Sequence, residues 1–259
     1  MRTCYFLLLA VLCASFVLPA AAQQPSTSAL QVPHQDSQAV SVLAQSLVAM
    51  GSLAAPNRMT LAQGTISYPD GSTTSITMET IGTDRVRHDV GINDFTFVSH
   101  AGDGFLITKG KKVKLKSWIT AYKRPEHLPA LSLMSDFQNP HFQIKYVGLE
   151  SITGNLAHHL RLSMLPADDT PVLFEDLMSE FHVWIDQKSL LVLKSRHFDF
   201  SPEAIQNRTP VDILYSDYRL QDGAMVPFHL VRFIAGEQQC EIVFSAISLN
   251  ASVSNSHFQ

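Results

Sequence analysis

The sequence predicts a mainly β protein of the α+β class, built on one large, curved antiparallel sheet. After residue 59, apolar residues recur at every second position between short turns rich in Gly, Asp and Pro. Strand candidates far outnumber the two or three helix candidates, and their order lacks the strand–helix alternation of a parallel sheet. A sheet of this size with few covering helices must bury one face on itself. We therefore expect an unclosed half-barrel whose concave face is covered by a few short helices.

The N-terminus is typical of a secretory signal peptide. Arg2 is followed by an apolar run from Tyr5 to Leu18, and the small residues Ala20 to Ala22 come next. The run is shorter than the roughly 20 residues that a bilayer-spanning helix needs. We interpret residues 1–22 as a signal peptide cleaved after Ala22, which predicts export to the periplasm. The alternative is a retained N-terminal anchor, which the short run disfavours.

Charge and cysteine content limit the function classes. Cleavage would remove Arg2 and leave 18 of the 19 basic residues against 23 acidic residues, so the net charge of the mature chain would be 18 − 23 = −5. This negative charge argues against a nucleic-acid partner. Cys4 and Cys13 would leave with the signal peptide, so the mature chain keeps Cys240 alone and forms no internal disulfide. Lipoprotein processing needs a small residue directly before the acylated cysteine, but Leu12 precedes Cys13. We therefore do not expect a lipid anchor at Cys13. Stability must then come from a core, which 46% hydrophobic residues can supply.

A polar leader and one helix precede the strands. Residues 23–35 have no sustained hydrophobic period, and we interpret them as a flexible leader. A single domain is expected from residue 36 to residue 259. Asp36 or Ser37 can cap a helix that ends at Gly51. The apolar residues of this helix have helical spacing: Val40, Leu43, Leu47 and Met50.

The strand candidates follow in two runs. The first run contains Met59–Tyr68, Ser72–Ile81, Asp84–Val90, Phe95–His100, Phe105–Lys109 and Lys112–Trp118. Between the runs, the leucine-rich stretch Ala121–Asp136 predicts a short apolar helix. A loop at Pro166–Pro171 interrupts the second run. This run contains Phe142–Leu149, Leu156–Met164, Phe181–Ile185, Leu190–Phe200, Val211–Leu220, Met225–Ile234 and Cys240–Leu249.

Four segments carry a resemblance to a known family: "DSQAVSVLAQSLVAMG", "YVGLESITGNLAHHLRLS", "FHVWIDQKSLLVLKSRHF", and "YSDYRLQDGAMVPFHLVRF" with "SAISLNASVSNSHF". The chain resembles the LolA/LolB-like superfamily of periplasmic lipoprotein carriers, also called outer-membrane lipoprotein-sorting proteins. The resemblance implies an unclosed β-barrel with an apolar concave face, capped by helices, whose interior holds acyl chains. It implies a carrier without enzymatic activity.

The apolar strand faces and the leucine-rich helix are the candidate ligand site. The helix Pro125–Asp136 is short and bounded by prolines, and we interpret it as a lid over the concave face. We expect the ligand to contact the inward-facing residues of the lid and the sheet: Leu128, Leu131, Met134, Phe181, Val183, Phe228 and Leu230. The expected partner is a lipid, another hydrophobic ligand or a lipidated protein, with an envelope protein as a further candidate. The mature protein should be a monomer without a transmembrane segment.

The sequence predicts no catalytic residue, metal ligand or cofactor. His158 and His159 are adjacent on a strand, so their side chains point to opposite faces and cannot bind one ion together. His197 and Asp199 share a face, but no third ligand is placed beside them. The G-x-S-x-G motif of serine hydrolases is absent. Two alternatives to the carrier stay open. One is an envelope assembly module without a ligand cavity, and the other is a hydrolase with clustered histidines.

The segment "KGKKVKLKSW" is strongly basic. Lys112, Lys114 and Lys116 alternate with apolar residues, so they share one face of a predicted strand. Such a face is typically solvated. The alternative interpretation is a basic stripe for anionic lipid headgroups or an acidic partner.

Overall fold

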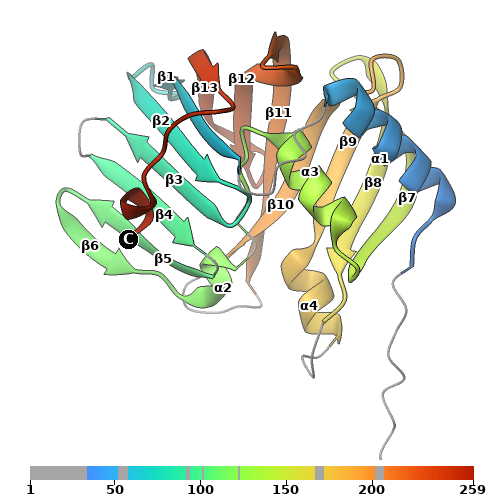
Figure 1. The fold of residues 1–259 in the computed structure, drawn as a ribbon, viewed down its shortest axis with the longest axis horizontal. Helices are drawn as coiled ribbons and strands as arrows, with labels where there is room; N and C mark the ends of the chain where they lie inside the picture. Colours follow the sequence, from blue (N-terminus) through green and yellow to red (C-terminus); the bar gives the residue numbers. More distant parts are fainter. Residues whose placement is uncertain are drawn as a thin grey trace, which may run out of the picture. The chain divides into compact units, whose positions relative to one another are not determined.

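Thirteen antiparallel strands form one sheet in the described residues, and its two end strands do not pair with each other (Figure 1). The computed structural model describes residues 34–51, 58–91, 94–100, 102–121, 123–166, 172–201 and 207–259. The predicted signal peptide and the predicted leader up to residue 33 lie outside these residues. The sheet confirms the predicted fold class of an unclosed, mainly β half-barrel.

Two meanders make up the sheet. The first contains β1 (Met59–Ser67), β2 (Thr73–Ile81), β3 (Arg85–Val90), β4 (Phe95–His100), β5 (Asp103–Thr108) and β6 (Lys111–Lys114), with β6 at one edge. The second begins at the other edge and contains β7 (Phe142–Ile152), β8 (Asn155–Met164), β9 (Phe181–Asp186), β10 (Val192–Phe200), β11 (Arg208–Gln221), β12 (Ala224–Ile234) and β13 (Glu237–Ser248).

The first and last strands join the meanders in the middle of the sheet. β1 pairs antiparallel with β13, with Leu61 opposite Ser248, and the register shifts between Gln63 and Gly64. A Cβ atom on Gly64 would lie 2.3 Å from the backbone oxygen of Val243. Only glycine therefore fits this close approach of the two backbones.

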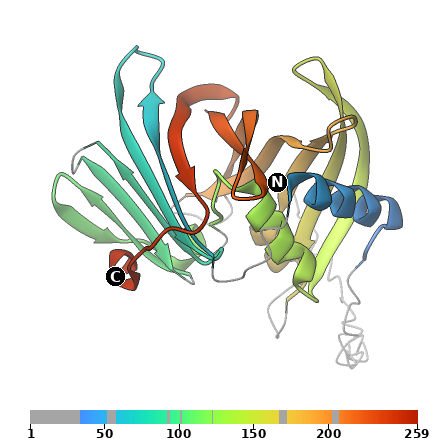
Figure 2. The same cartoon turned by 45° about the horizontal axis from the view of Figure 1, so that its top comes forward.

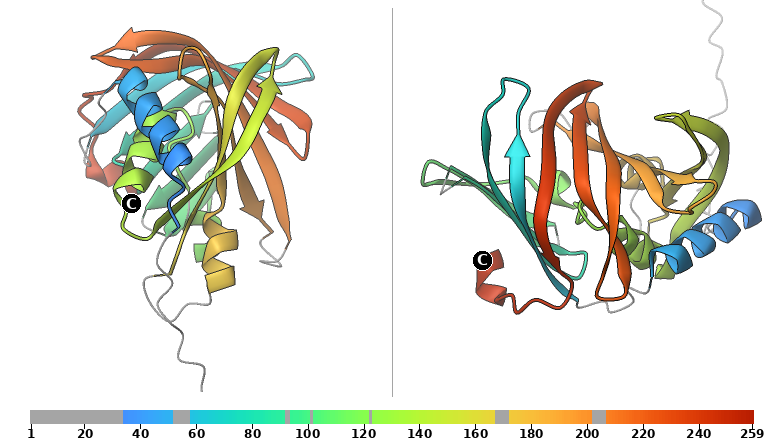
Figure 3. Two further views of the ribbon diagram at one scale, coloured as in Figure 1. Left: turned by 90° about the vertical axis from the view of Figure 1, so that its right-hand side faces the viewer. Right: turned by 90° about the horizontal axis from the view of Figure 1, so that it is seen from above.

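Two of the helices cover the concave face over the second meander. The view from above in Figure 3 shows the curvature of the sheet, and Figure 2 shows α1 (Ser37–Met50) and α3 (Pro129–Gln138) beside the strands from β7 to β12. Asp36 caps α1 as predicted, because its Oδ1 accepts from the backbone N–H groups of Gln38 at 2.9 Å and Ala39 at 3.1 Å. These helices and the strand faces below them form one continuous apolar core.

The C-terminal residues lie on the opposite, outer face of the first meander. Phe258, in the 3₁₀ helix η1 (Asn255–Phe258), packs in a small separate cluster with Ile81 and Val98. Nη1 of Arg87 donates to the backbone oxygen of His257 at 2.8 Å and fixes the segment against β3.

The structure differs from the sequence predictions of local structure at three places. The strand predicted at Lys112–Trp118 ends at Lys114, and α2 (Ser117–Thr120) follows it. A helix that the sequence did not indicate, α4 (Val172–Ser179), lies between β8 and β9. The predicted helix within Ala121–Asp136 begins only at Pro129, which occupies the first turn of α3, where proline is tolerated.

Candidate functional site

A cavity of about 330 Å³ lies on the concave face between the first meander and α2. Most of its walls are apolar, and its lining residues are Val86, Phe95, Phe97, Leu106, Leu115, Ile119 and Phe200, together with His88, Lys123, Arg124, Glu126, Asp199 and Arg232. The cavity therefore combines apolar walls with a group of charged side chains.

Strand alternation turns the apolar residues of the first meander into the cavity. In the sheet register, His88 lies opposite Phe97, and Phe97 lies opposite Leu106. These three side chains therefore share the concave face, whereas their neighbours Val98 and Phe105 point to the outer face with the C-terminal cluster. No helix as long as α1 or α3 covers the described strands here, so the face keeps room beside it.

The short helix α2 forms the far wall of the cavity. The hydroxyl of Thr120 donates to the backbone oxygen of Gly102 at 2.5 Å, and the hydroxyl of Ser99 donates to the backbone oxygen of Thr120 at 3.3 Å. Nε1 of Trp118 donates to the backbone oxygen of Ser201 at 3.3 Å. These bonds connect α2 to both meanders and hold Ile119 against the cavity.

Five side chains on the concave face form what we call the charged cluster: Lys123, Glu126, His197, Asp199 and Arg232. Nε2 of His197 lies 3.4 Å from Oε1 of Glu126 and 3.7 Å from Oδ1 of Asp199. Nη2 of Arg232 lies 3.5 Å from Oδ2 of Asp199, and its Nε lies 3.9 Å from Oε2 of Glu126. Lys123 forms an ion pair with Asp199. Each carboxylate is thus held between basic groups.

The charged cluster sets the ionisation of its members. Burial would raise the pKa of Glu126, but the positive charges around it, Arg232 first and then His197, His88 and Lys123, together outweigh burial and hold this pKa at about 2. Burial lowers the pKa values of His88 and His197 to about 4 each. Both imidazoles are therefore neutral at neutral pH. Two cations then face two carboxylates, and the formal charge of the cluster is zero.

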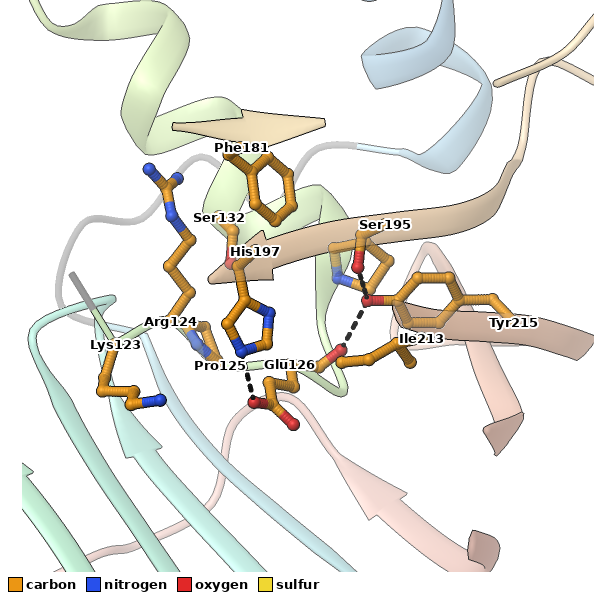
Figure 4. Close-up of a pocket in the computed structure, with 11 residues that line it drawn as sticks. Lys123, Arg124, Pro125, Glu126, Ser132, Phe181, Ser195, His197, Ile213 and Tyr215 are labelled. Carbon is orange, nitrogen blue, oxygen red and sulfur yellow. Dashed lines mark hydrogen bonds and ion pairs between the residues drawn. The ribbon is translucent and has the colours of Figure 1, made fainter. Parts of the chain in front are cut away.

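A smaller cavity of about 20 Å³ adjoins the charged cluster (Figure 4). The hydroxyl of Tyr215 donates to the backbone oxygen of Glu126 at 3.0 Å and lies 2.8 Å from the hydroxyl of Ser195. Tyr215 thereby fixes the segment that carries Glu126. A volume of this size holds about one water molecule, so it does not suit an organic ligand.

The seven residues predicted to bind ligand lie in the apolar core. Six of them are at most 5% exposed, and Met134 is partly buried against the same core. The structure brings α3 and the strand faces of β9 and β12 together, as expected, but none of the seven lines the 330 Å³ cavity. Phe181 lines the 20 Å³ cavity. Their role in ligand binding stays a prediction.

Two histidine rings, those of His159 and His182, lie against each other on the outer face of the sheet. Nε2 of His159 lies 2.8 Å from Nδ1 of His182, and the ring of His159 stacks on Trp184. Each histidine also contacts a carboxylate, Glu150 at 2.6 Å and Glu180 at 2.8 Å. His158 points to the concave face and contacts the hydroxyl of Tyr146 at 2.9 Å. Among the described residues, no group of three or more His, Cys, Asp or Glu side chains could hold a metal ion.

The lysines of the basic segment lie at the sheet edge. Lys112 and Lys114 are exposed on β6, and Lys116 is exposed just before α2. The ammonium of Lys112 lies 3.7 Å from the centroid of the Phe105 ring, on the outer face. Lysines on an edge strand oppose pairing with another sheet.

The curved sheet, its covering helices and the internal cavity together define a half-barrel fold. The chain is similar in structure to a LolA superfamily protein from Nitrosomonas europaea, with a TM-score of 0.52 and 12% identity over 85% of this chain and 97% of that one. A domain from Vibrio parahaemolyticus named for outer-membrane lipoprotein sorting gives a TM-score of 0.52 and 14% identity, over 85% and 96% of the two chains. A DUF1329 family protein from Desulfovibrio piger matches with a TM-score of 0.50 and 13% identity, over 86% of this chain and 96% of that one.

These structural matches confirm the predicted resemblance to LolA-like proteins at the level of the fold. No protein-family model and no curated protein matches the sequence. Within the described ranges, every helix is too short or too polar to cross a membrane.

Proposed function

We propose that this protein is a non-enzymatic periplasmic carrier that binds a lipid or the acyl chain of a lipoprotein in the 330 Å³ cavity. The observation that supports this proposal best is an apolar-walled cavity on the concave face of an unclosed sheet. The signal-peptide-like N-terminus supports a location in the periplasm. The resemblance to lipoprotein carriers supports the choice of ligand.

The size of the cavity limits the ligand. Cavities that take drug-sized ligands measure about 300–1,000 Å³, so 330 Å³ suits one small amphiphile or part of one acyl chain. Each methylene group moved from water to the apolar walls contributes about 0.8 kcal/mol. Affinity should therefore rise with chain length until the cavity is filled.

Filling the cavity tests the proposal. We expect Leu106→Trp to weaken the binding of a fluorescent fatty-acyl probe at least tenfold, because the larger ring takes the space of the chain without adding charge. Val243→Trp is the matched control, because Val243 is 47% exposed on the outer face of β13. Probe titration and circular dichroism of both variants, with native mass spectrometry of the gently purified protein, give the readout.

Three outcomes are distinct. Loss of probe binding in Leu106→Trp alone, with a bound lipid in the mass spectrum, supports the carrier. Unchanged probe binding in Leu106→Trp would contradict the cavity as the site and favour the seven core residues in α3 and on the strands that it covers. No binding of probe or lipid to the wild-type protein would overturn the carrier and favour the envelope assembly module.

A further inference from the structure

Two polar nitrogen atoms of the cavity are buried without a hydrogen-bond partner among the described residues. They are Nε2 of His88 and Nε of Arg232. Both side chains line the 330 Å³ cavity. Nε of Arg232 is a donor, and Nε2 of neutral His88 is a donor in the tautomer that carries the ring proton there. A buried donor without a partner is costly, so a group that accepts from it is favoured at this place. An alkyl chain has no acceptor for these nitrogens.

The sheet register places the two nitrogens on the same concave face. His88 on β3 lies opposite Phe97, and its ring packs 5.9 Å from the Phe97 ring, so the imidazole extends from an apolar wall. Arg232 on β12 belongs to the charged cluster. The lining of the cavity therefore combines both nitrogens with apolar side chains, among them Phe97 beside His88.

The charge around the donors selects the kind of acceptor. Arg232 already lies 3.5 Å from Asp199 and 3.9 Å from Glu126, and both carboxylates line the cavity. A ligand carboxylate that approached Arg232 would meet these two negative charges in a partly buried place. A ligand cation would likewise meet Lys123 and Arg232. An uncharged oxygen acceptor meets neither repulsion.

We propose that the cavity takes an amphiphile with its uncharged polar end inward, so that an ester or amide carbonyl accepts hydrogen bonds from His88 and Arg232. This inference rests on the carrier function proposed above and specifies its ligand. The chain of the amphiphile then lies along Phe97, Leu106 and the other apolar walls. The site discriminates against a free fatty acid with the same chain.

The test compares head groups on one chain. Methyl laurate, lauric acid and dodecylamine compete with a fluorescent acyl probe for the full-length mature protein at pH 7.5. We expect the ester to compete about tenfold more strongly than the acid or the amine, which corresponds to a buried hydrogen bond without charge repulsion. Monomeric concentrations of each compound, below micelle formation, keep the comparison valid.

Two His88 variants and a control locate the effect. His88→Phe keeps a ring beside Phe97 but removes Nε2, and we expect it to reduce the preference for the ester several-fold. His88→Gln places an amide donor near the former Nε2 and should restore the preference. His100→Phe is the matched control, because His100 lies on β4 and lines an outer-face groove. It should keep the wild-type preference.

The outcomes separate the two proposals. Equal competition by all three head groups would overturn the proposed head-group recognition and leave the carrier intact. Stronger competition by the acid or the amine would also overturn it. Failure of every dodecyl compound, and of the probe itself, would overturn the carrier and this inference together. If His88→Phe does not fold, the wild-type head-group series and His88→Gln still decide.

Discussion

His127 should make this protein sensitive to mild acid. The residue follows Glu126, is 0% exposed, and neither of its ring nitrogens has a hydrogen-bond partner among the described residues. Its ring packs at 6.0 Å from the ring of Phe244 in the core. Burial, with a smaller contribution from the neighbouring His88, lowers the pKa of His127 from 6.5 to about 3. The folded protein therefore holds this imidazole in its neutral form.

The sign and size of the effect follow from linkage. The unfolded chain binds a proton at His127 below about pH 6.5, and the folded chain does so only near pH 3. The contribution of neutral His127 to stability is thus complete above pH 6.5 and is lost as the pH falls toward 3. Between pH 8 and pH 5 the folded protein loses about 2 kcal/mol of stability. The loss begins at the unfolded pKa of 6.5, which lies about 1.5 pH units above pH 5, and each pH unit contributes about 1.36 kcal/mol.

Urea unfolding at pH 8 and pH 5 measures this loss. His127→Phe keeps the aromatic contact with Phe244 and removes the titration, so we expect its free energy of unfolding to fall about 2 kcal/mol less than that of the wild type over this pH range. His88 and His197 remain in both proteins, so their contributions cancel in the difference. His34→Phe, at an exposed position, should behave like the wild type. Equal losses in the wild type and His127→Phe would refute the reasoning.

Two further substitutions test the core. Tyr215→Phe should lower the free energy of unfolding by about 1–3 kcal/mol in urea unfolding, because Ser195 and the backbone oxygen of Glu126 lose a buried partner. An unchanged midpoint would show that Tyr215 does not hold this segment. Cys240→Ala should cost about 1 kcal/mol for the small cavity and leave probe binding unchanged, because Cys240 is a buried thiol whose pKa burial raises. Weaker binding at equal stability would contradict this.

Strand alternation made most of the sheet predictable from the sequence. In β2, for example, the buried Ile76 and Met78 alternate with polar residues, as the period of two requires. The Asp36 cap and the Gly51 stop of α1 are local signals. The strand predicted at Lys112–Trp118 was too long for a physical reason. Its alternation continues past Lys114, but the hydrogen bonds of Thr120 to Gly102 and of Ser99 to Thr120 favour a helical turn. Those partners are distant in sequence.

The helix α4 was missed for a similar reason. Asp176 accepts from Nη2 of Arg161 at 2.6 Å and from the hydroxyl of Ser163 at 2.6 Å, and the hydroxyl of Ser179 accepts from the backbone N–H of Met164 at 2.8 Å. A helix of eight residues is weak by itself. Its contacts with β8 stabilise it, and no local pattern reveals them.

The position of the cavity could not be predicted from the sequence, for a different reason. Alternation shows which residues share a strand face, so it correctly grouped Phe181 with Val183 and Phe228 with Leu230. It does not show which part of a concave face a helix fills. α1 and α3 pack over the second meander and bury those residues, while Phe97 and Leu106 in the first meander keep open space beside them. The charged cluster likewise joins Glu126 with residues of β10 and β12.

The pairing of β1 with β13 has a consequence for the order of folding. Each meander consists of neighbours along the chain, which close quickly because their loops are short. The ladder that joins them must wait for β13 (Glu237–Ser248), which follows all the other strands of the sheet in the sequence. Until then the edge of β1 (Met59–Ser67) has an unpaired row of backbone groups, which can capture the β1 edge of another molecule. We expect slow refolding with a yield that falls as protein concentration rises, and a chaperone that shields β1 would raise that yield.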